Sequence, residues 1–304
     1  MSKDDIEDST APLIEHLAEL RTRILWSLAA FLVGMVICFS FGSMLLDFLL
    51  LPIEKTMRAL GNANPVMQYT APQEYFFTLI RISMVGGLGL SFPVIAYQMW
   101  RFVAPGLYRT EKQAFLPFLV ASPVLFLIGA SFAHFVVVPL AMQFFLGFAD
   151  LPSYFAAVFS GDGVRKPVAD HGIDIVFNGK VNETLDITLK MIVAFGLCFQ
   201  LPVLLTLMGK AGLASSRGLR GVRKYAVVGI LSVAAIVTPP DVTTQVLLFV
   251  VVYGLYELSI LLVQWVEKKK DAEARAEGIL GEDESLFGEV DDDEPEPEDE
   301  AGKA

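Results

Sequence analysis

The chain alternates between long apolar runs and shorter polar connections. Six apolar segments stand out among its 304 residues. They cover residues 24–46, 76–99, 115–142, 187–208, 222–237 and 242–266. Most of them have the roughly 20 residues that an α-helix needs to cross a ~30 Å hydrocarbon core. The pattern predicts an all-α integral membrane protein whose membrane domain, residues 24–266, contains six transmembrane helices.

The fifth segment and several prolines modify this simple picture. The apolar stretch from Tyr225 to Val237 would extend only about 20 Å as a helix, which predicts a thinned bilayer or burial against neighbouring helices. Pro93, Pro123 and Pro202 lie inside predicted spans. Each proline removes one backbone hydrogen bond, so we expect helices that are kinked rather than straight.

Positive charge is distributed unequally between the two sides of the predicted membrane domain. With alternating loops, one side collects fifteen lysines and arginines and the other side five. Because cytoplasmic loops are enriched in these residues, both termini are expected to be cytoplasmic. The external side then carries two long connections, residues 47–75 and 143–186, and a tight link in which Pro239 and Pro240 end one helix and Asp241 caps the next.

The two ends of the chain differ from the membrane domain. Residues 1–23 are polar with a stripe formed by Leu13, Leu17 and Leu20, which predicts an amphipathic cytoplasmic segment. Residues 267–304 are predicted to form a disordered acidic cytoplasmic tail, since fifteen acidic residues face two basic ones from residue 271 onward. The tail accounts for the net charge of −11. A solvated tail is the simpler interpretation, and an acidic arm that binds a partner is the alternative.

Composition and missing motifs exclude several classes of function. Apolar residues make up 54% of the chain and the mean hydropathy is +0.55, as expected of a membrane protein. No P-loop, H-E-x-x-H or G-x-S-x-G motif occurs, which argues against ATP hydrolysis and intramembrane proteolysis. The three histidines are scattered. We therefore expect no enzyme, no cofactor and no metal site, and no nucleic-acid partner.

Two cytoplasmic stretches carry candidate binding chemistry. Glu19 lies four residues before Arg23, which suits an ordinary ion pair on an interfacial helix; the alternative is a carboxylate that awaits a cationic ligand. Residues 100–112 combine aromatic and charged side chains, among them Phe102 and Glu111. A carboxylate beside apolar surface suits arginine flanked by hydrophobic residues, because guanidinium binds carboxylate bidentately.

Polar side chains inside the predicted spans form the other candidates. Gln200, Gln245 and Glu257 each lie within or at the end of an apolar segment. In lipid such a group must find a partner, so each is a hypothesis of packing or of function. His134 is alone in the third span and is expected to be a packed or interfacial side chain.

Five segments together resemble one family. HLAELRTRI at 16–24, SFPVIAYQMWRFVAPGLYRTEK at 91–112, FVVVPLA at 135–141, FQLPV at 199–203 and TPPDVTTQ at 238–245 are similar, in this order, to signature segments of the TatC family, the Sec-independent (twin-arginine) protein translocase subunits. The resemblance covers about residues 12–265, and the six-helix topology with both termini inside agrees with it.

The resemblance implies a receptor of the bacterial inner membrane. TatC proteins, together with TatB, bind the twin-arginine signal peptides of folded cargo and gather TatA for export driven by the proton-motive force, as a multimer of TatBC units within membrane lipid. The family residues that contact the signal peptide match Glu19 and Glu111, with Arg21 and Phe102 adjacent.

The resemblance also implies an external loop and a contact for partner helices. The external proline and aspartate of the family match Pro52 and Asp241. The polar site for TatA and TatB helices matches Gln200, with Thr238 and Gln245 nearby. Many members carry glutamate at position 200; glutamine keeps a hydrogen-bonding group there but removes a titratable proton.

Two other classes of protein compete with this interpretation. A secondary transporter for a small solute would favour an inverted repeat and a polar site at the bilayer midplane, and neither is visible in the sequence. A purely structural membrane scaffold would leave Glu19 and Glu111 without a purpose.

Overall fold

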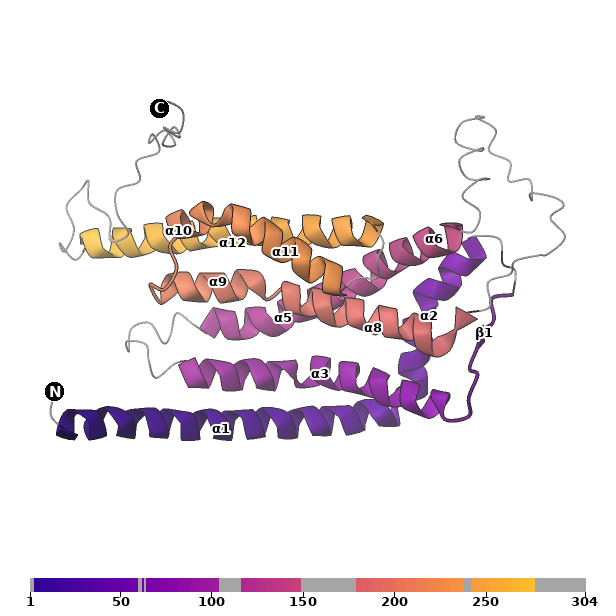
Figure 1. Cartoon of the computed structure of the whole chain (residues 1–304), viewed down its shortest axis with the longest axis horizontal. Coiled ribbons are helices and arrows are strands. Elements are labelled where there is room, and N and C mark those ends of the chain that lie inside the picture. The colour runs from indigo at the N-terminus through magenta and orange to yellow at the C-terminus, as the bar shows by residue number, and fades with distance from the viewer. Residues whose placement is uncertain are drawn as a thin grey trace, which may run out of the picture.

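A computed structural model describes residues 3–59, 62, 64–103, 116–148, 179–237 and 242–276 of the chain. Within these residues the chain is almost entirely helical (Figure 1). The helices are α1 (Lys3–Ser40), α2 (Gly42–Ala59), α3 (Glu74–Val103), α5 (Leu116–Phe132), a π-helical turn (Ala133–Val137), α6 (Val138–Phe148), α8 (Val181–Cys198), α9 (Leu201–Lys210), α10 (Ser216–Gly221), α11 (Arg223–Val237) and α12 (Val242–Ala276).

The long helices lie side by side along the longest dimension of the molecule (Figure 1). The start of α1 and the end of α12 lie at the same end of this bundle, which we call the terminal end. At the opposite end, which we call the far end, strand β1 (Met67–Gln68) pairs in parallel with strand β2 (Gly179–Lys180). The common position of the two helix ends agrees with the expectation that both termini lie on one side of the membrane.

Five helical stretches are long and apolar enough to cross a membrane. They are His16–Ser40, Glu74–Phe102, Phe118–Leu146, Val181–Lys210 and Thr244–Ala276. This result confirms the class of an all-α, multi-span membrane protein. The exposed surface of these stretches is rich in large apolar side chains, which a surrounding bilayer would cover.

The expected fifth span is short. Helix α11 has 15 residues, which corresponds to about 22 Å, and it carries the chain back toward the start of α12 (Figure 1). Its length matches the short apolar stretch seen in the sequence. A sixth crossing of the membrane therefore remains a prediction.

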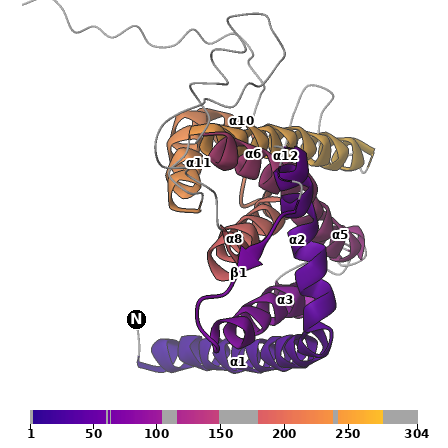
Figure 2. The same ribbon diagram turned by 90° about the vertical axis from the view of Figure 1, so that its right-hand side faces the viewer.

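The expected first span, residues 24–46, proves to be parts of two helices. Helix α1 ends at Ser40 and α2 begins at Gly42, then crosses the far end of the bundle toward α6 (Figure 2). Helix α2 buries a stripe with helical spacing that includes Leu46, Leu49 and Ile53. The sequence interpretation missed this amphipathic helix because residues 44–46 are apolar and continue the apolar run of α1.

The N-terminal segment is helical as expected, and the C-terminal segment is more helical than expected. Helix α1 is continuous across residue 23, so the predicted N-terminal segment is not a separate helix. Helix α12 continues to Ala276, and the expectation of disorder is therefore wrong for residues 267–276. Lys269 and Glu273, one turn apart with 3.8 Å between Nζ and Oε1, lie in this extension. Residues 277–304 lie outside the described part of the chain.

The prolines interrupt helices in two ways. Pro93 lies inside α3 and Pro123 lies inside α5, at the positions where the sequence predicts prolines within spans. Pro202 lies just after a two-residue interruption within the single stretch Val181–Lys210, because α8 ends at Cys198 and α9 begins at Leu201 with the proline in its first turn. A proline in the first turn costs no hydrogen bond, since that N–H has no partner in a helix.

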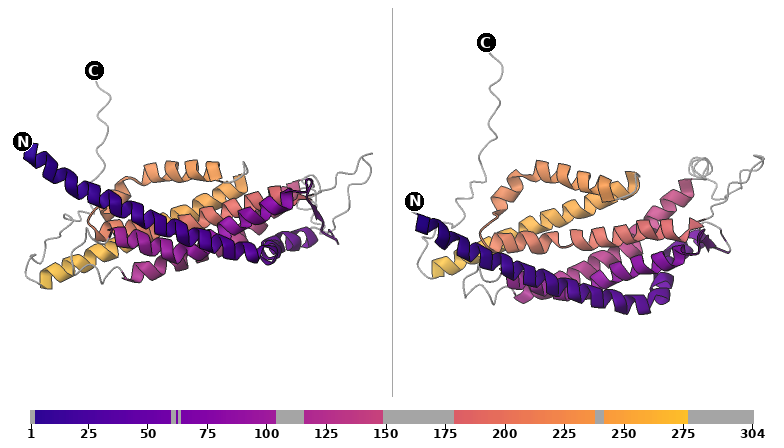
Figure 3. Two further views of the ribbon diagram at one scale, coloured as in Figure 1. Left: turned by 90° about the horizontal axis from the view of Figure 1, so that it is seen from below. Right: turned by 60° about the horizontal axis from the view of Figure 1, so that its bottom comes forward.

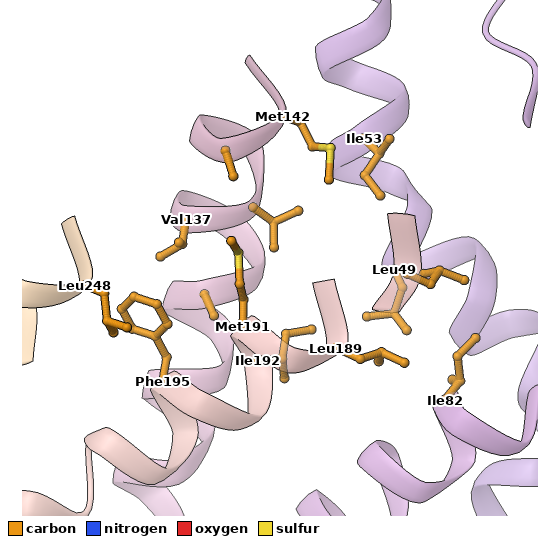
Figure 4. Close-up of a cluster of buried hydrophobic side chains, with 14 of the residues drawn as sticks. Leu49, Ile53, Ile82, Val137, Met142, Leu189, Met191, Ile192, Phe195 and Leu248 are labelled. Carbon is orange, nitrogen blue, oxygen red and sulfur yellow. The ribbon is translucent and has the colours of Figure 1, made fainter. Parts of the chain in front are cut away.

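A hydrophobic core connects the central helices. It contains Leu49 and Ile53 of α2, Val137 of the π-helical turn, Phe195 of α8 and Leu248 of α12 (Figure 4). Helix α1 takes little part in it: only 6% of its membrane-crossing stretch is buried, and it lies along the outside of α3 (Figure 3).

Glycines allow α1 to pack closely on α3. A Cβ atom at Gly87 would lie 2.7 Å from the backbone nitrogen of Met35, and one at Gly34 would lie 2.9 Å from the carbonyl oxygen of Gly87. Small residues at such crossings let two backbones approach, which matters in lipid because no hydrophobic effect drives helices together there.

Glycines also allow α5 to pack closely on α8. A Cβ at Gly129 would lie 2.6 Å from the carbonyl oxygen of Phe195, and one at Gly196 would lie 2.8 Å from the ring of Phe126. Each glycine thus receives an aromatic residue's backbone or ring from the facing helix. These two crossings fix α1 on α3 and α5 on α8.

We predict that Gly87→Ala destabilises the protein whereas Gly89→Ala does not. The new methyl group at Gly87 would collide with backbone, at a cost of roughly 1–3 kcal/mol. At Gly89 the nearest atom, in the ring of Phe126, is 3.7 Å away, an ordinary contact distance. Thermal unfolding in detergent, followed by size-exclusion chromatography, should show a lower melting temperature for Gly87→Ala only. Equal melting temperatures for the two variants would show that α1 and α3 can move apart at this crossing without loss of stability.

Candidate functional site

The first candidate site lies on the seam between α1 and α3 at the terminal end. The rings of His16 on α1 and Phe102 on α3 stack with centroids 4.3 Å apart. Two turns further along α1, Arg23 donates to Oε1 of Gln98 on α3, over 3.4 Å. Glu19 lies three residues after His16 and four before Arg23, so all three side chains share one face of α1 and Glu19 lies on this seam.

Glu19 is paired yet accessible. Its Oε1 accepts a hydrogen bond from Arg23 over 2.8 Å, which confirms the ion pair expected from the spacing of four residues. The Glu19 side chain is 30% exposed and the Arg23 side chain 17%. Among the described residues the Nε of Arg23 has no hydrogen-bond partner. The seam therefore already holds one guanidinium against the carboxylate, beside aromatic surface.

The other residues predicted for this site are only partly described. Arg21 is exposed on α1 next to the seam. Phe102 is half-buried against His16 near the end of α3, and Arg101 before it lies 5.9 Å from the centre of the Tyr97 ring. Glu111 lies outside the described residues. The structure thus brings Glu19 and Phe102 onto one seam and leaves Glu111 as a sequence-based prediction.

Gln200 occupies the break between α8 and α9 and bonds to α5. Its Oε1 accepts from the hydroxyl of Ser122 over 2.6 Å, and its Nε2 donates to the Ser122 carbonyl over 3.0 Å. The side chain of Gln200 thus fastens α5, beside Pro123, to the junction of α8 and α9, beside Pro202. Gln200 remains half-buried, and its amide keeps a second N–H and further lone pairs.

The remaining predicted residues lie elsewhere. Gln245 is half-buried in the first turn of α12. Thr238 and Asp241 lie outside the described residues. Pro52, expected in an external connection, is buried within α2 at the far end, and its carbonyl accepts from Thr56 over 2.9 Å.

Two acidic side chains of α12 have partners, whereas neither ring nitrogen of the buried His134 has a hydrogen-bond partner among the described residues; its ring stacks on Phe48 with centroids 4.5 Å apart, as expected of a packed side chain. Glu257 of α12 pairs with Arg223 of α11 over 2.7 Å. Glu267 accepts from the backbone N–H of Ser216 over 2.8 Å, at the start of α10. These contacts hold α10 and α11 against α12 near the terminal end.

Sequence reasoning missed a charged cluster on α3 and α8. Lys190 pairs with Asp186 over 2.6 Å, and Arg81 lies 2.9 Å from Oδ1 of Asn182 and 3.6 Å from Oδ1 of Asp186. The signal was present: Arg81 interrupts an apolar run, and Asp186 precedes Lys190 by four residues. Within the described residues no group of three or more histidine, cysteine or acidic side chains is placed to hold a metal ion.

The fold and these sites define a multi-span helical membrane protein with a carboxylate-bearing seam at one end and paired polar groups between its helices. Residues 15–250 match the family described as "Sec-independent protein translocase protein (TatC)". The chain belongs to the TatC family. It is a multi-pass component of the inner-membrane twin-arginine translocase rather than an enzyme.

Individual relatives agree with this assignment. The chain is 41% identical over 273 residues to the Sec-independent protein translocase protein TatC of Magnetococcus marinus, covering 90% of this chain and 91% of that protein. It is 38% identical to the TatC protein of Aquifex aeolicus, covering 85% and 97%. A crystal structure of a "Twin Arginine Translocase Receptor- TatC" superposes with a TM-score of 0.66 at 37% identity, covering 83% of this chain and 99% of that one.

Proposed function

We propose that the chain is the receptor subunit that binds twin-arginine signal peptides, together with TatB, and recruits TatA for export driven by the proton-motive force. The observation that carries this proposal is the accessible carboxylate of Glu19, held by Arg23 on a seam beside Phe102. A site of this kind suits a guanidinium followed by apolar residues. The similar crystal structure is that of a twin-arginine translocase receptor, which supports the same role for this chain.

The arrangement of Glu19 suggests how an arginine of the peptide is recognised. Carboxylate accepts guanidinium in a bidentate fork, and Arg23 uses only one of the two oxygens, Oε1. Each carboxylate oxygen can accept more than one hydrogen bond, so Glu19 can bind the first ligand arginine through both oxygens while Oε1 keeps its bond to Arg23. Glu111 then supplies the acceptor for the second arginine, as the resemblance to the family implies.

The distribution of charge supports a cytoplasmic position for the terminal end. Cations gather where α9 ends, along α10, where α11 begins and where α12 ends. They include Lys210, Arg217, Arg220, Arg223, Lys224, Lys268, Lys269, Lys270 and Arg275. Such enrichment is typical of cytoplasmic loops, so Glu19 would face the compartment in which signal peptides are made.

Gln200 is the proposed contact for partner helices, with Thr238 and Gln245 nearby. Its bonds to Ser122 limit what it can offer to a partner, yet the amide retains donor and acceptor capacity. Glutamine cannot ionise, so this contact needs no proton. We propose that TatBC units assemble into a multimer through such helix contacts.

Orientation can be tested by labelling single cysteines. With the endogenous Cys38 and Cys198 replaced by serine, a cysteine at Lys3 or at residue 285 should react only from the cytoplasmic side. A cysteine at Arg165 should react only from outside. The charge distribution gives this expectation. Labelling of Lys3 and residue 285 from opposite sides would mean an odd number of crossings.

Recognition of the signal peptide can be tested by a double-mutant cycle between protein and peptide. Charge-assisted hydrogen bonds to arginine contribute about 1.5–3 kcal/mol each. Glu111→Ala should therefore lower peptide affinity roughly ten- to a hundredfold, and Glu111→Asp less. A peptide with Lys–Lys in place of Arg–Arg should bind more weakly to the parent protein, because lysine cannot form the fork. The measurement is peptide binding to detergent-solubilised protein with TatB present.

The Lys–Lys penalty should largely vanish in the Glu19→Ala, Glu111→Ala double variant. A matched control is Glu54→Ala, because Glu54 forms the same kind of pair with Arg58, over 2.9 Å, in α2 at the far end. It should leave both affinities unchanged. If the penalty persists undiminished in the double variant, these glutamates do not recognise the arginines. Unaltered binding in every variant would favour the scaffold interpretation.

Docking of partner helices can be tested with Gln200→Leu and Ser122→Ala. Hydrogen bonds between membrane helices are worth only about 0.6–2 kcal/mol, so Gln200→Leu should weaken co-purification of TatB and TatA modestly. Ser122→Ala removes the internal hydroxyl partner but keeps the amide, and should preserve the association. Equal loss in both variants would show that Gln200 acts only by fastening α8 to α5.

A further inference from the structure

The charged cluster that the sequence interpretation missed lies on the rim of a groove between α3 and α8. The groove has a volume of about 930 Å³. Arg81, Asp186 and Lys190 are its charged lining residues, and Met84, Val193 and Leu197 are among its apolar ones. Ile236, near the end of α11, also lines it. We call this the α3–α8 groove.

The charges of the rim are coupled and face outward. Asp186 contacts both cations, with Lys190 Nζ at 2.6 Å and Arg81 at 3.6 Å, and Asn182 also accepts from Arg81. The side chains remain open to the surroundings: Arg81 is 48% exposed, Lys190 65% and Asp186 38%. Two cations against one carboxylate leave one net positive charge on the rim.

By the length of its helices, the rim lies near one boundary of the hydrocarbon core. The stretch Glu74–Phe102 has 29 residues, about 43 Å, which exceeds the ~30 Å hydrocarbon core by roughly 13 Å. Divided between both ends, this excess places the first 6–7 Å or so of α3 among the headgroups. Arg81 lies about 10 Å from Glu74 and Lys190 about 13 Å from Val181 along their helices. Their Cα atoms therefore lie just inside the hydrocarbon boundary.

Both cationic side chains lean toward the headgroups. Helices α3 and α8 both begin at the far end, and side chains on a helix point toward its N-terminus (Figure 1). Long cationic side chains just inside the boundary extend in this way to reach polar surroundings. Arginine binds phosphate bidentately and lysine binds it as a point charge. Basic pockets between transmembrane helices bind lipid headgroups for this reason.

We propose that the α3–α8 groove binds one phospholipid with a net negative headgroup, from the leaflet at the far end. Its phosphate contacts Arg81 and Lys190, and one acyl chain lies along Met84, Val193 and Leu197. The net charge of the rim complements that of the lipid. The site is independent of signal-peptide binding, which belongs to the opposite end of the bundle.

The test is native mass spectrometry of the purified full chain in detergent, titrated with dioleoyl-phosphatidylglycerol. Arg81→Gln, Lys190→Gln should weaken binding of this lipid at least about tenfold. A matched control, Lys55→Gln, Lys180→Gln, removes two cations from the same end outside the groove. The affinity of this control for the lipid should lie within about twofold of that of the parent chain. Glycerol phosphate, which lacks acyl chains, should not bind to any variant at the same concentrations.

A second variant keeps the proposal testable if the charge variant unfolds. Ala194→Phe fills the groove and leaves the rim intact, since Ala194 lines the groove. It should also weaken lipid binding, while size-exclusion elution stays unchanged. Equal losses in the charge variant and its matched control would overturn the proposal, as would equal affinity for dioleoyl-phosphatidylethanolamine, which has no net charge. If both groove variants bind the lipid as well as the parent chain does, but no longer co-purify with a protein that carries an acidic helix, the groove binds a protein partner.

Discussion

The close approach of helix backbones at glycine crossings is the constraint on which the other contacts of this protein rely. In lipid, apolar side chains gain nothing by leaving their surroundings for another helix, so association must come from packing and polar contacts. Gly34 and Gly87 let α1 lie against α3, and Gly129 and Gly196 let α5 lie against α8. A side chain at these positions would push the two backbones apart. The other contacts between the same helices would then be lost.

The contacts of the candidate sites follow from these crossings. The His16–Phe102 stack and the Arg23–Gln98 hydrogen bond exist because α1 and α3 stay close from their glycine crossing to the terminal end. Without this seam Glu19 would be a solvated carboxylate on an isolated helix. Likewise, the close packing of α5 on α8 brings Ser122 within reach of Gln200, where two helices are interrupted by proline.

The two ends of the bundle carry different chemistry. At the terminal end a carboxylate is held by arginine beside aromatic surface, which suits a cationic peptide. At the far end two cations are held by one carboxylate above an apolar groove, which suits an anionic amphiphile. Both sites use internal ion pairs, one at the terminal end and two at the far end, to fix charged groups while leaving part of their hydrogen-bonding capacity available.

The membrane class, most of the long helices, the short α11 and the Glu19–Arg23 pair could all be predicted from the sequence. All of these depend on local spacing: apolar length, proline positions and an interval of four residues. The sequence also contained the motifs that identify the family. The fold decided what spacing cannot express, namely that the helix of residues 42–59 turns across the far end, that Gln200 bonds to Ser122 and that Arg81 meets Asp186. These contacts join residues 78 and about 100 positions apart, and only the packing of whole helices brings such residues together.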